Sequence, residues 1–148
     1  MKTILKICMI SVVLLLLQAC QGNVATNEEG GELSLKFATA INDGKYEEAF
    51  SLVSDGFFGS MTKAERIAYY EEIKKIMGPV KSVKLSSSLV DDRFSGRFYM
   101  FRYAFQHENG ISMEMVTMLQ KINSKEPLKV FAHKVESSKL KKLNHRFN

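Results

Sequence analysis

Residues 97–122, RFYMFRYAFQHENGISMEMVTMLQKI, contain the pattern that decides the fold of this chain. Aromatic and β-branched residues, which favour strands, are frequent on both sides of Glu108-Asn109-Gly110. An Asn-Gly pair between two such runs is the strongest short-range sign of a β-hairpin. We therefore predict two antiparallel strands, Arg97 to His107 and Ile111 to Ile122, joined by a tight turn.

The hairpin has two apolar faces. If Asn109 and Gly110 form the turn, Glu108 pairs with Ile111, and Phe105 lies opposite Glu114. The first face then holds Tyr99, Phe101, Tyr103, Phe105, Val116 and Met118, and the second holds Met100, Ala104, Met115 and Leu119. A sheet with one face in water alternates more cleanly between apolar and polar residues. One face should pack on helices, while the other is partly covered, lines a cavity or meets another subunit.

The flanking sequence completes an α+β domain. Helical spacing runs from residue 32 to 42, from 45 to 53 and from 62 to about 77, where Gly78-Pro79 ends the third helix. Alternation then predicts strands over 80–89 and 128–135. The prediction is three N-terminal helices packed on a curved four-stranded antiparallel sheet. The adjacent rings Phe57 and Phe58 are expected to plug the core, with a mobile lid or a partner-binding spot as alternatives.

Residues 1–20 are typical of a secretory signal. Lys2 and Lys6 precede an apolar run that is too short to span a bilayer comfortably. The ending Leu17-Gln18-Ala19-Cys20 resembles the lipobox of bacterial lipoproteins, which implies cleavage between Ala19 and Cys20 and a lipid on Cys20. An uncleaved membrane helix is the alternative. Position 21 is Gln rather than Asp, and the resemblance to lipoproteins of enteric bacteria then implies the outer membrane, facing the periplasm, in a Gram-negative cell. In a Gram-positive cell the same signal implies the outer leaflet of the only membrane.

These signals divide the chain into a signal peptide (1–19), a lipidated cysteine with a flexible tether (20–31), an α+β domain (32–136) and a basic C-terminal tail (137–148). The tail is expected to be a solvated, frayed end, with contact to anionic lipid headgroups or other polyanions as the alternative. The two cysteines are Cys8 and Cys20, so no disulfide or thiol nucleophile remains for the domain. Removing Lys2 and Lys6 lowers the net charge from +5 to +3. An export signal argues against a nucleic-acid partner.

Two short motifs carry a family resemblance. Phe37, Ala40, Gly44-Lys45-Tyr46 and Ala49-Phe50, followed by Met77-Gly78-Pro79-Val80, resemble the helix pair and first strand of the nuclear-transport-factor-2-like (NTF2-like) superfamily. The resemblance covers Leu33 to Val135. It implies a cone closed by helices, in a superfamily that includes a ketosteroid isomerase, a dehydratase, transport factors and many domains of no known activity. The Trp common in the last strand is absent, since the chain has none.

The interior of that cone supplies the candidate site. No residue matches the superfamily's catalytic motifs, so none is assigned a catalytic role, and no metal or other cofactor is expected. A buried Glu114 could still serve as an acid or base. The residues expected to line a pocket are Tyr99, Phe101, Tyr103, Glu114, Met118, Phe131 and His133.

The sequence thus favours a non-enzymatic, lipid-anchored module of the cell envelope. It is expected to bind an envelope protein, or a second copy as a homodimer, through its sheet, and the membrane through the lipid on Cys20. The first alternative is a small hydrophobic ligand in the cone, and the second is an enzyme that uses Glu114.

Overall fold

The computed structural model describes residues 25–121, 124 and 126–147. The predicted signal peptide and Cys20 lie outside these ranges. Three helices come first, α2 (Asn27–Asn42), α3 (Tyr46–Ser51) and α4 (Lys63–Met77). Four strands follow, β1 (Val80–Arg93), β2 (Gly96–His107), β3 (Gly110–Lys121) and β4 (Lys129–Glu136), and then η2 (Ser138–Leu140) and α5 (Lys141–Phe147). The predicted α+β architecture is confirmed. None of these helices is long and apolar enough to cross a membrane.

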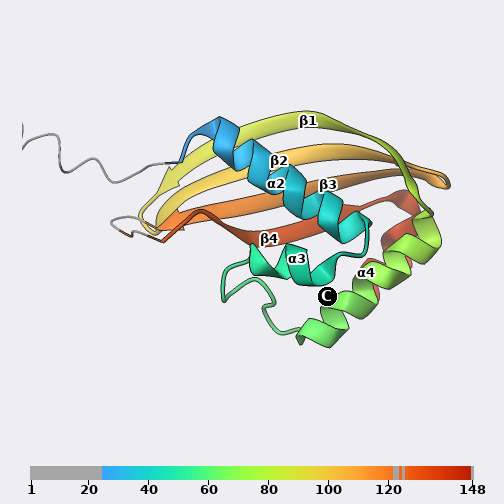
Figure 1. The fold of residues 1–148 in the computed structure, drawn as a ribbon. Helices are drawn as coiled ribbons and strands as arrows, with labels where there is room; N and C mark the ends of the chain where they lie inside the picture. The colour runs from blue at the N-terminus through green and yellow to red at the C-terminus, as the bar shows by residue number, and fades with distance from the viewer. Residues whose placement is uncertain (1–24, 122–123, 125, 148) are drawn as a thin grey trace, which may run out of the picture.

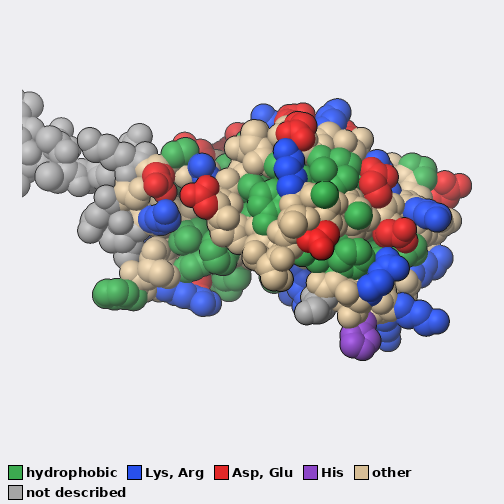
Figure 2. Space-filling view, turned by 90° about the horizontal axis from the view of Figure 1, so that it is seen from below, with side chains coloured by type: hydrophobic (Ala, Val, Ile, Leu, Met, Phe, Trp, Pro, Cys, Tyr) green, Lys and Arg blue, Asp and Glu red, His purple; other side chains and the backbone are tan. Residues whose placement is uncertain are grey.

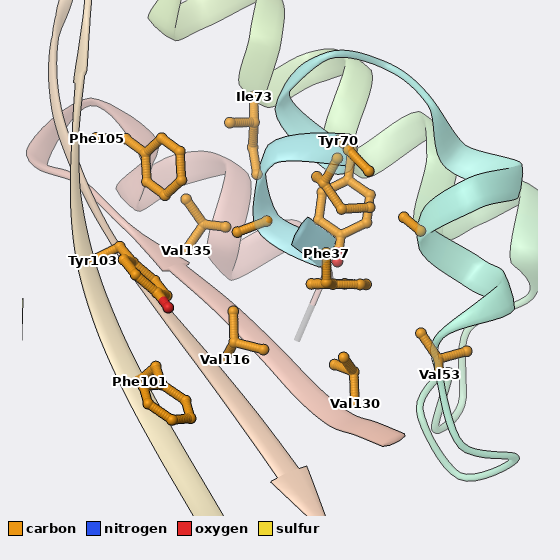
Figure 3. Close-up of a cluster of buried hydrophobic side chains, with 14 of the residues drawn as sticks. Phe37, Val53, Tyr70, Ile73, Phe101, Tyr103, Phe105, Val116, Val130 and Val135 are labelled. Atoms are coloured by element: carbon orange, nitrogen blue, oxygen red, sulfur yellow. The ribbon is translucent and has the colours of Figure 1, made fainter. Parts of the chain in front are cut away.

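The four strands form an antiparallel meander in the order β1-β2-β3-β4. Figure 1 shows α2 lying across one face of the sheet, with α3 and α4 beside the β4 side of the same face. We call this the covered face. Figure 3 shows Phe101, Tyr103 and Val116 of the strands pointing toward Phe37 and Tyr70 of the helices. The core is therefore built between this face and the helices.

The β2–β3 register differs from the prediction by two residues. His107 pairs with Gly110, so Glu108 and Asn109 form the turn, and Tyr103 rather than Phe105 lies opposite Glu114. The end of α4 fixes this turn, because the Asn109 backbone N–H donates to the Met77 carbonyl at 2.9 Å. A shift of two residues keeps every side chain on its predicted face.

The beginning of α2 corrects the predicted tether. Thr26 and Glu29 form a capping box, in which each side chain accepts from the other residue's backbone N–H, and the helix starts at Asn27. The Ala25 N–H donates to Gln120 Oε1 at 2.9 Å, and the Ala25 carbonyl accepts from the Tyr99 hydroxyl. The stretch from 27 to 31 is thus part of a helix fastened to the sheet, not a flexible linker.

The C-terminal segment is likewise ordered, contrary to the expectation of a frayed tail. Leu140 and Leu143 are buried, and the Tyr69 hydroxyl of α4 donates to Asn144 Oδ1 at 2.9 Å. Their burial explains why η2 and α5 pack on α4 while the lysines between them stay exposed. Figure 2 shows Lys and Arg side chains gathered at this side of the molecule.

The Phe57-Phe58 loop supports the core interpretation of these rings. Phe57 is buried and meets Phe37 edge-to-face, with ring centroids 5.5 Å apart. Phe58 is partly buried and packs against the same cluster.

Gly96 gives a test of the β1–β2 connection. Its φ is +151°, and a Cβ there would lie 2.5 Å from the Gln120 carbonyl oxygen. We expect Gly96→Ala to lower the free energy of unfolding by about 2–4 kcal/mol in urea titrations. Gly59→Ala is the matched control, because Gly59 has φ +58° and open space around it, and should cost only about 1–2 kcal/mol. Equal losses would show that the close contact at Gly96 is unimportant.

Candidate functional site

A chain of buried polar side chains runs through the covered face. At its centre Glu114 of β3 is 1% exposed. Asn42, at the end of α2, donates from Nδ2 to both carboxylate oxygens, at 3.2 and 3.3 Å, and also to the Ala38 carbonyl. The carboxylate therefore links the sheet to the end of α2.

One arm of the chain leads from Glu114 to α4. His133 Nε2 on β4 lies 3.1 Å from Glu114 Oε2, and His133 Nδ1 lies 3.0 Å from the Tyr70 hydroxyl. Burial raises the pKa of Tyr70 far above its ordinary value, so this hydroxyl keeps its proton. Phe37 meets the His133 ring edge-to-face, with centroids 5.2 Å apart.

The second arm leads to the β2–β3 turn. Ser112 Oγ lies 3.2 Å from Glu114 Oε1 and 2.9 Å from His107 Nε2. His107 Nδ1 in turn lies 3.1 Å from the Gly78 carbonyl oxygen, at the end of α4. Asn42, Glu114 and these two arms together join α2, α4 and three strands.

The hydrogen bonds of this buried polar network restrict how many protons its side chains carry. The five contacts from Gly78 to Tyr70 each need one proton. Two neutral histidines, one serine, one tyrosine and an ionised Glu114 supply only four. The complete set requires a fifth proton, on Glu114 Oε1 or on His107, because Ser112 has one proton for its two contacts. The fully hydrogen-bonded network of side chains then has no net charge, which avoids the cost of an unpaired buried charge.

The network has acid–base groups but no room for a substrate. The side chains of Glu114 and His133 are 1% and 0% exposed. A hollow of about 80 Å³ beside His133 is lined by Arg66, Tyr69 and Asn144, among others. Ligand pockets usually measure about 300–1,000 Å³. The geometry therefore fits a structural polar core better than a reaction centre.

The structure brings together most of the predicted pocket residues but uses them for packing. Tyr103 donates to the Gly31 carbonyl at 3.2 Å and shares a 2.6 Å hydrogen bond with Ser34 Oγ, while Tyr99 donates to Ala25. Both hydroxyls are thus bonded to α2 or its start. Phe101 and Met118 are buried in the core with Glu114 and His133.

Phe131 does not join them. It is 39% exposed, and its ring meets Phe98 on the opposite face at 6.0 Å. The cause is an irregularity in the β3–β4 pairing between Thr117 and Met118, where Ala132 and Val130 are the successive partners. Val130 takes the inward position, so the assignment of Phe131 to the cone was wrong.

The network also contains residues that the sequence did not single out. Asn42, Tyr70, His107 and Ser112 complete it. The strand alternation places Ser112 on the same face as Glu114, which was an available signal. Asn42 and Tyr70 come from helices 72 and 63 residues away from their partners, and no local pattern announces such pairings.

The opposite face of the sheet carries a second cluster, which we call the open face. The described helices pack on the covered face, and no other described element packs on the open face. Its apolar side chains are partly or largely exposed: Leu89, Phe98, Met100, Ala104, Ile111, Met113, Met115, Leu119 and Phe131. Methionines are flexible and polarizable, and they are frequent at adaptable binding surfaces.

Comparison with known proteins supports the fold. The structure resembles an NTF2-like protein from Cytophaga hutchinsonii ATCC 33406 (TM-score 0.50, 15% identity, 77% of this chain and 99% of that chain). It also resembles a protein from Shewanella frigidimarina NCIMB 400 described as a candidate ketosteroid isomerase (TM-score 0.50, 9% identity, 77% and 98%). The chain thus has an NTF2-like fold.

A third similar structure is the Bd1075 protein of Bdellovibrio bacteriovorus (TM-score 0.50, 10% identity). The match covers 75% of this chain but 41% of that protein. No protein-family model matches the sequence, and no curated protein matches it. These identities establish a shared fold alone.

Metal ligands do not assemble in the described part of the chain. Within residues 25–121 and 126–147, no three side chains of the types His, Cys, Asp and Glu come together to hold an ion.

The polar chain predicts different results for two Glu114 variants. A Gln amide donates to Ser112 while its oxygen accepts from His133 and Asn42, so Glu114→Gln should stay within about 1 kcal/mol of the wild type in urea unfolding. Glu114→Ala leaves the buried Ser112 and His133 and the half-buried Asn42 without this partner and should cost about 3–5 kcal/mol. Glu136→Ala, which removes only an exposed ion pair with Lys134, is the control and should cost less than about 1 kcal/mol. Equal losses for Gln and Ala would contradict this account.

Proposed function

We propose that this protein is a non-catalytic, lipid-anchored module of the cell envelope that binds a protein partner through the open face of its sheet. A second copy of the chain is the first partner to test. The observation that carries the proposal is the run of partly exposed apolar side chains on this face, whereas the described helices pack on the other face.

The composition of the open face supports a docking surface. Neighbouring strands place Phe98 opposite Leu119 and Ala104 opposite Met113. A face that only meets water normally presents polar residues at such positions. Large contiguous apolar patches on a domain surface mark interaction sites. Arg102 and Lys134 flank Met115 across the strands and would form a polar part of the contact.

The free edge of β1 is less suited to docking. Among the described strands β1 pairs only with β2, and it is exposed along nearly all of its length. Lys81 and Lys84 lie on it, and two irregularities interrupt its pairing with β2. Charges and bulges of this kind discourage edge-to-edge pairing of strands. The proposed contact is therefore face to face, as in packed sheets.

The packing of the interior argues against the two alternatives, a small ligand in the cone and an enzyme that uses Glu114. A cone ligand would need space that the buried rings of Tyr99, Phe101 and Phe105 occupy. An enzyme based on Glu114 would need a path for its substrate to a carboxylate that is 1% exposed. The anchor is supported by the sequence Leu17-Gln18-Ala19-Cys20 alone. It predicts that the chain fractionates with membranes and that Cys20→Ser releases it.

A charge on the open face should weaken the interaction. Met115→Glu places a carboxylate between Arg102 and Lys134, where the fold should tolerate it. We expect the wild-type full chain, extracted in mild detergent and chemically cross-linked, to give a dimer or a defined complex by mass spectrometry. Met115→Glu should weaken that complex at least about tenfold, which corresponds to about 1.4 kcal/mol.

Leu35→Glu is the matched control for this experiment. Leu35 is 36% exposed on α2, away from the open face, and its substitution should leave the complex unchanged. A wild-type chain that is monomeric and captures no protein in intact cells would contradict the proposal. So would equal weakening by both substitutions.

A further inference from the structure

We propose that the sheet end formed by the β1–β2 turn rests on a phospholipid surface, which holds the strands upright from the membrane. This inference rests on the proposed lipid anchor at Cys20. It adds an orientation and a second membrane contact that the anchor alone does not require.

The segment between Cys20 and Ala25 is short. Ala25 is bonded to Gln120 and Tyr99, so the chain is fixed to the domain from residue 25. Five residue steps separate Cys20 from Ala25, and they span at most about 18 Å when fully extended. A lipid on Cys20 would therefore keep the point where Ala25 joins the sheet within about 18 Å of the bilayer.

Ala25 is bonded to the end of the sheet that carries the β1–β2 turn. Gln120, which accepts from Ala25, pairs with Arg97 at the beginning of β2. Arg97 is three residues from Phe94 in the turn, so the two lie at most about 10 Å apart. Figure 1 shows the start of α2 and the β1–β2 turn at the same end of the sheet, with the β2–β3 turn at the other. The short segment between Cys20 and Ala25 thus brings the β1–β2 turn toward the bilayer.

The β1–β2 turn carries an exposed aromatic ring. Phe94 is 104% exposed, the highest value among the exposed large apolar residues. Figure 2 shows hydrophobic side chains projecting at this end of the molecule beside Lys and Arg. An aromatic ring next to cationic side chains suits the interface between headgroups and acyl chains.

Apolar contact, rather than net charge, is the expected source of this attachment. Arg93 and Arg97 are paired with Asp91 and Asp92, so the turn attracts anionic headgroups only weakly. Phe98 and Phe131 lie in contact with each other on the open face behind the turn. The ring of Phe94 is therefore the group expected to enter the interface.

This orientation has a consequence for the proposed partner. With the strands upright, the open face stands perpendicular to the membrane surface and faces sideways along it. A partner anchored in the same membrane could then reach it without crossing the bilayer. The exposed lysines and arginines of η2 and α5 would remain available on the helix side.

The chain offers a clean test because it contains no Trp. The full lipidated protein carrying Phe94→Trp is reconstituted into phosphatidylethanolamine and phosphatidylglycerol vesicles with or without brominated acyl chains. A ring that enters the interface by about 5–10 Å meets the bromines, so the emission of the new Trp should fall at least about twofold. Ile111→Trp is the matched control, because Ile111 is 55% exposed beside the β2–β3 turn at the opposite end.

The outcomes separate the orientation from the anchor. Quenching of the Phe94→Trp variant but not of the Ile111→Trp variant supports the proposal. Vesicle-bound protein in which both variants are equally quenched, or neither is, overturns the orientation and leaves the anchor intact. A chain that does not co-sediment with vesicles and lacks the mass of a lipid on Cys20 overturns the proposed anchor, and the orientation falls with it.

Discussion

The helices described between residues 25 and 147 all lie on one face of the four-stranded sheet, and the remaining features depend on that constraint. Both faces are apolar, because most aromatic residues of β2 lie with Val116 and Met118 on the covered face, while Met100, Met113, Met115 and Leu119 lie on the open face. The covered face is filled by rings from α2, α4 and the strands, so its interior is used for stability. The open face keeps exposed apolar surface that folding alone does not explain.

The buried chain around Glu114 determines how the helices sit on the covered face. An apolar core tolerates many packings of similar volume, whereas a satisfied polar network requires particular partners. Asn42 can reach Glu114 only when α2 ends at the right point, and Tyr70 can reach His133 only with α4 in place. Acid–base residues in a fold shared with enzymes need not be catalytic, because function depends on an accessible site and not on the fold.

Much of the fold could be predicted from local patterns, and the failures have identifiable causes. The hairpin faces were predicted because strand alternation has a period of two, but the register was not, since the carbonyl of Met77 fixes the turn from outside the hairpin. Phe131 was assigned to the wrong face because a pairing irregularity shifts the alternation of β4. Glu114 and His133 were identified as inward-facing, but their helix partners are distant in sequence. The Thr26–Glu29 capping box was a readable signal for a helix start at Asn27.

Methionine oxidation can show whether a protein partner covers the open face in the cell. Met100, Met113 and Met115 are partly exposed on that face, whereas Met77 and Met118 are fully buried and serve as internal references. A peroxide pulse is applied to intact cells and to dilute, detergent-extracted chain, and sulfoxides are quantified by mass spectrometry. Met61, which is partly exposed but lies outside the open face, should react equally in both samples. If the face is occupied, the three open-face methionines should oxidise more slowly in cells. Equal rates at these positions in both samples would contradict it.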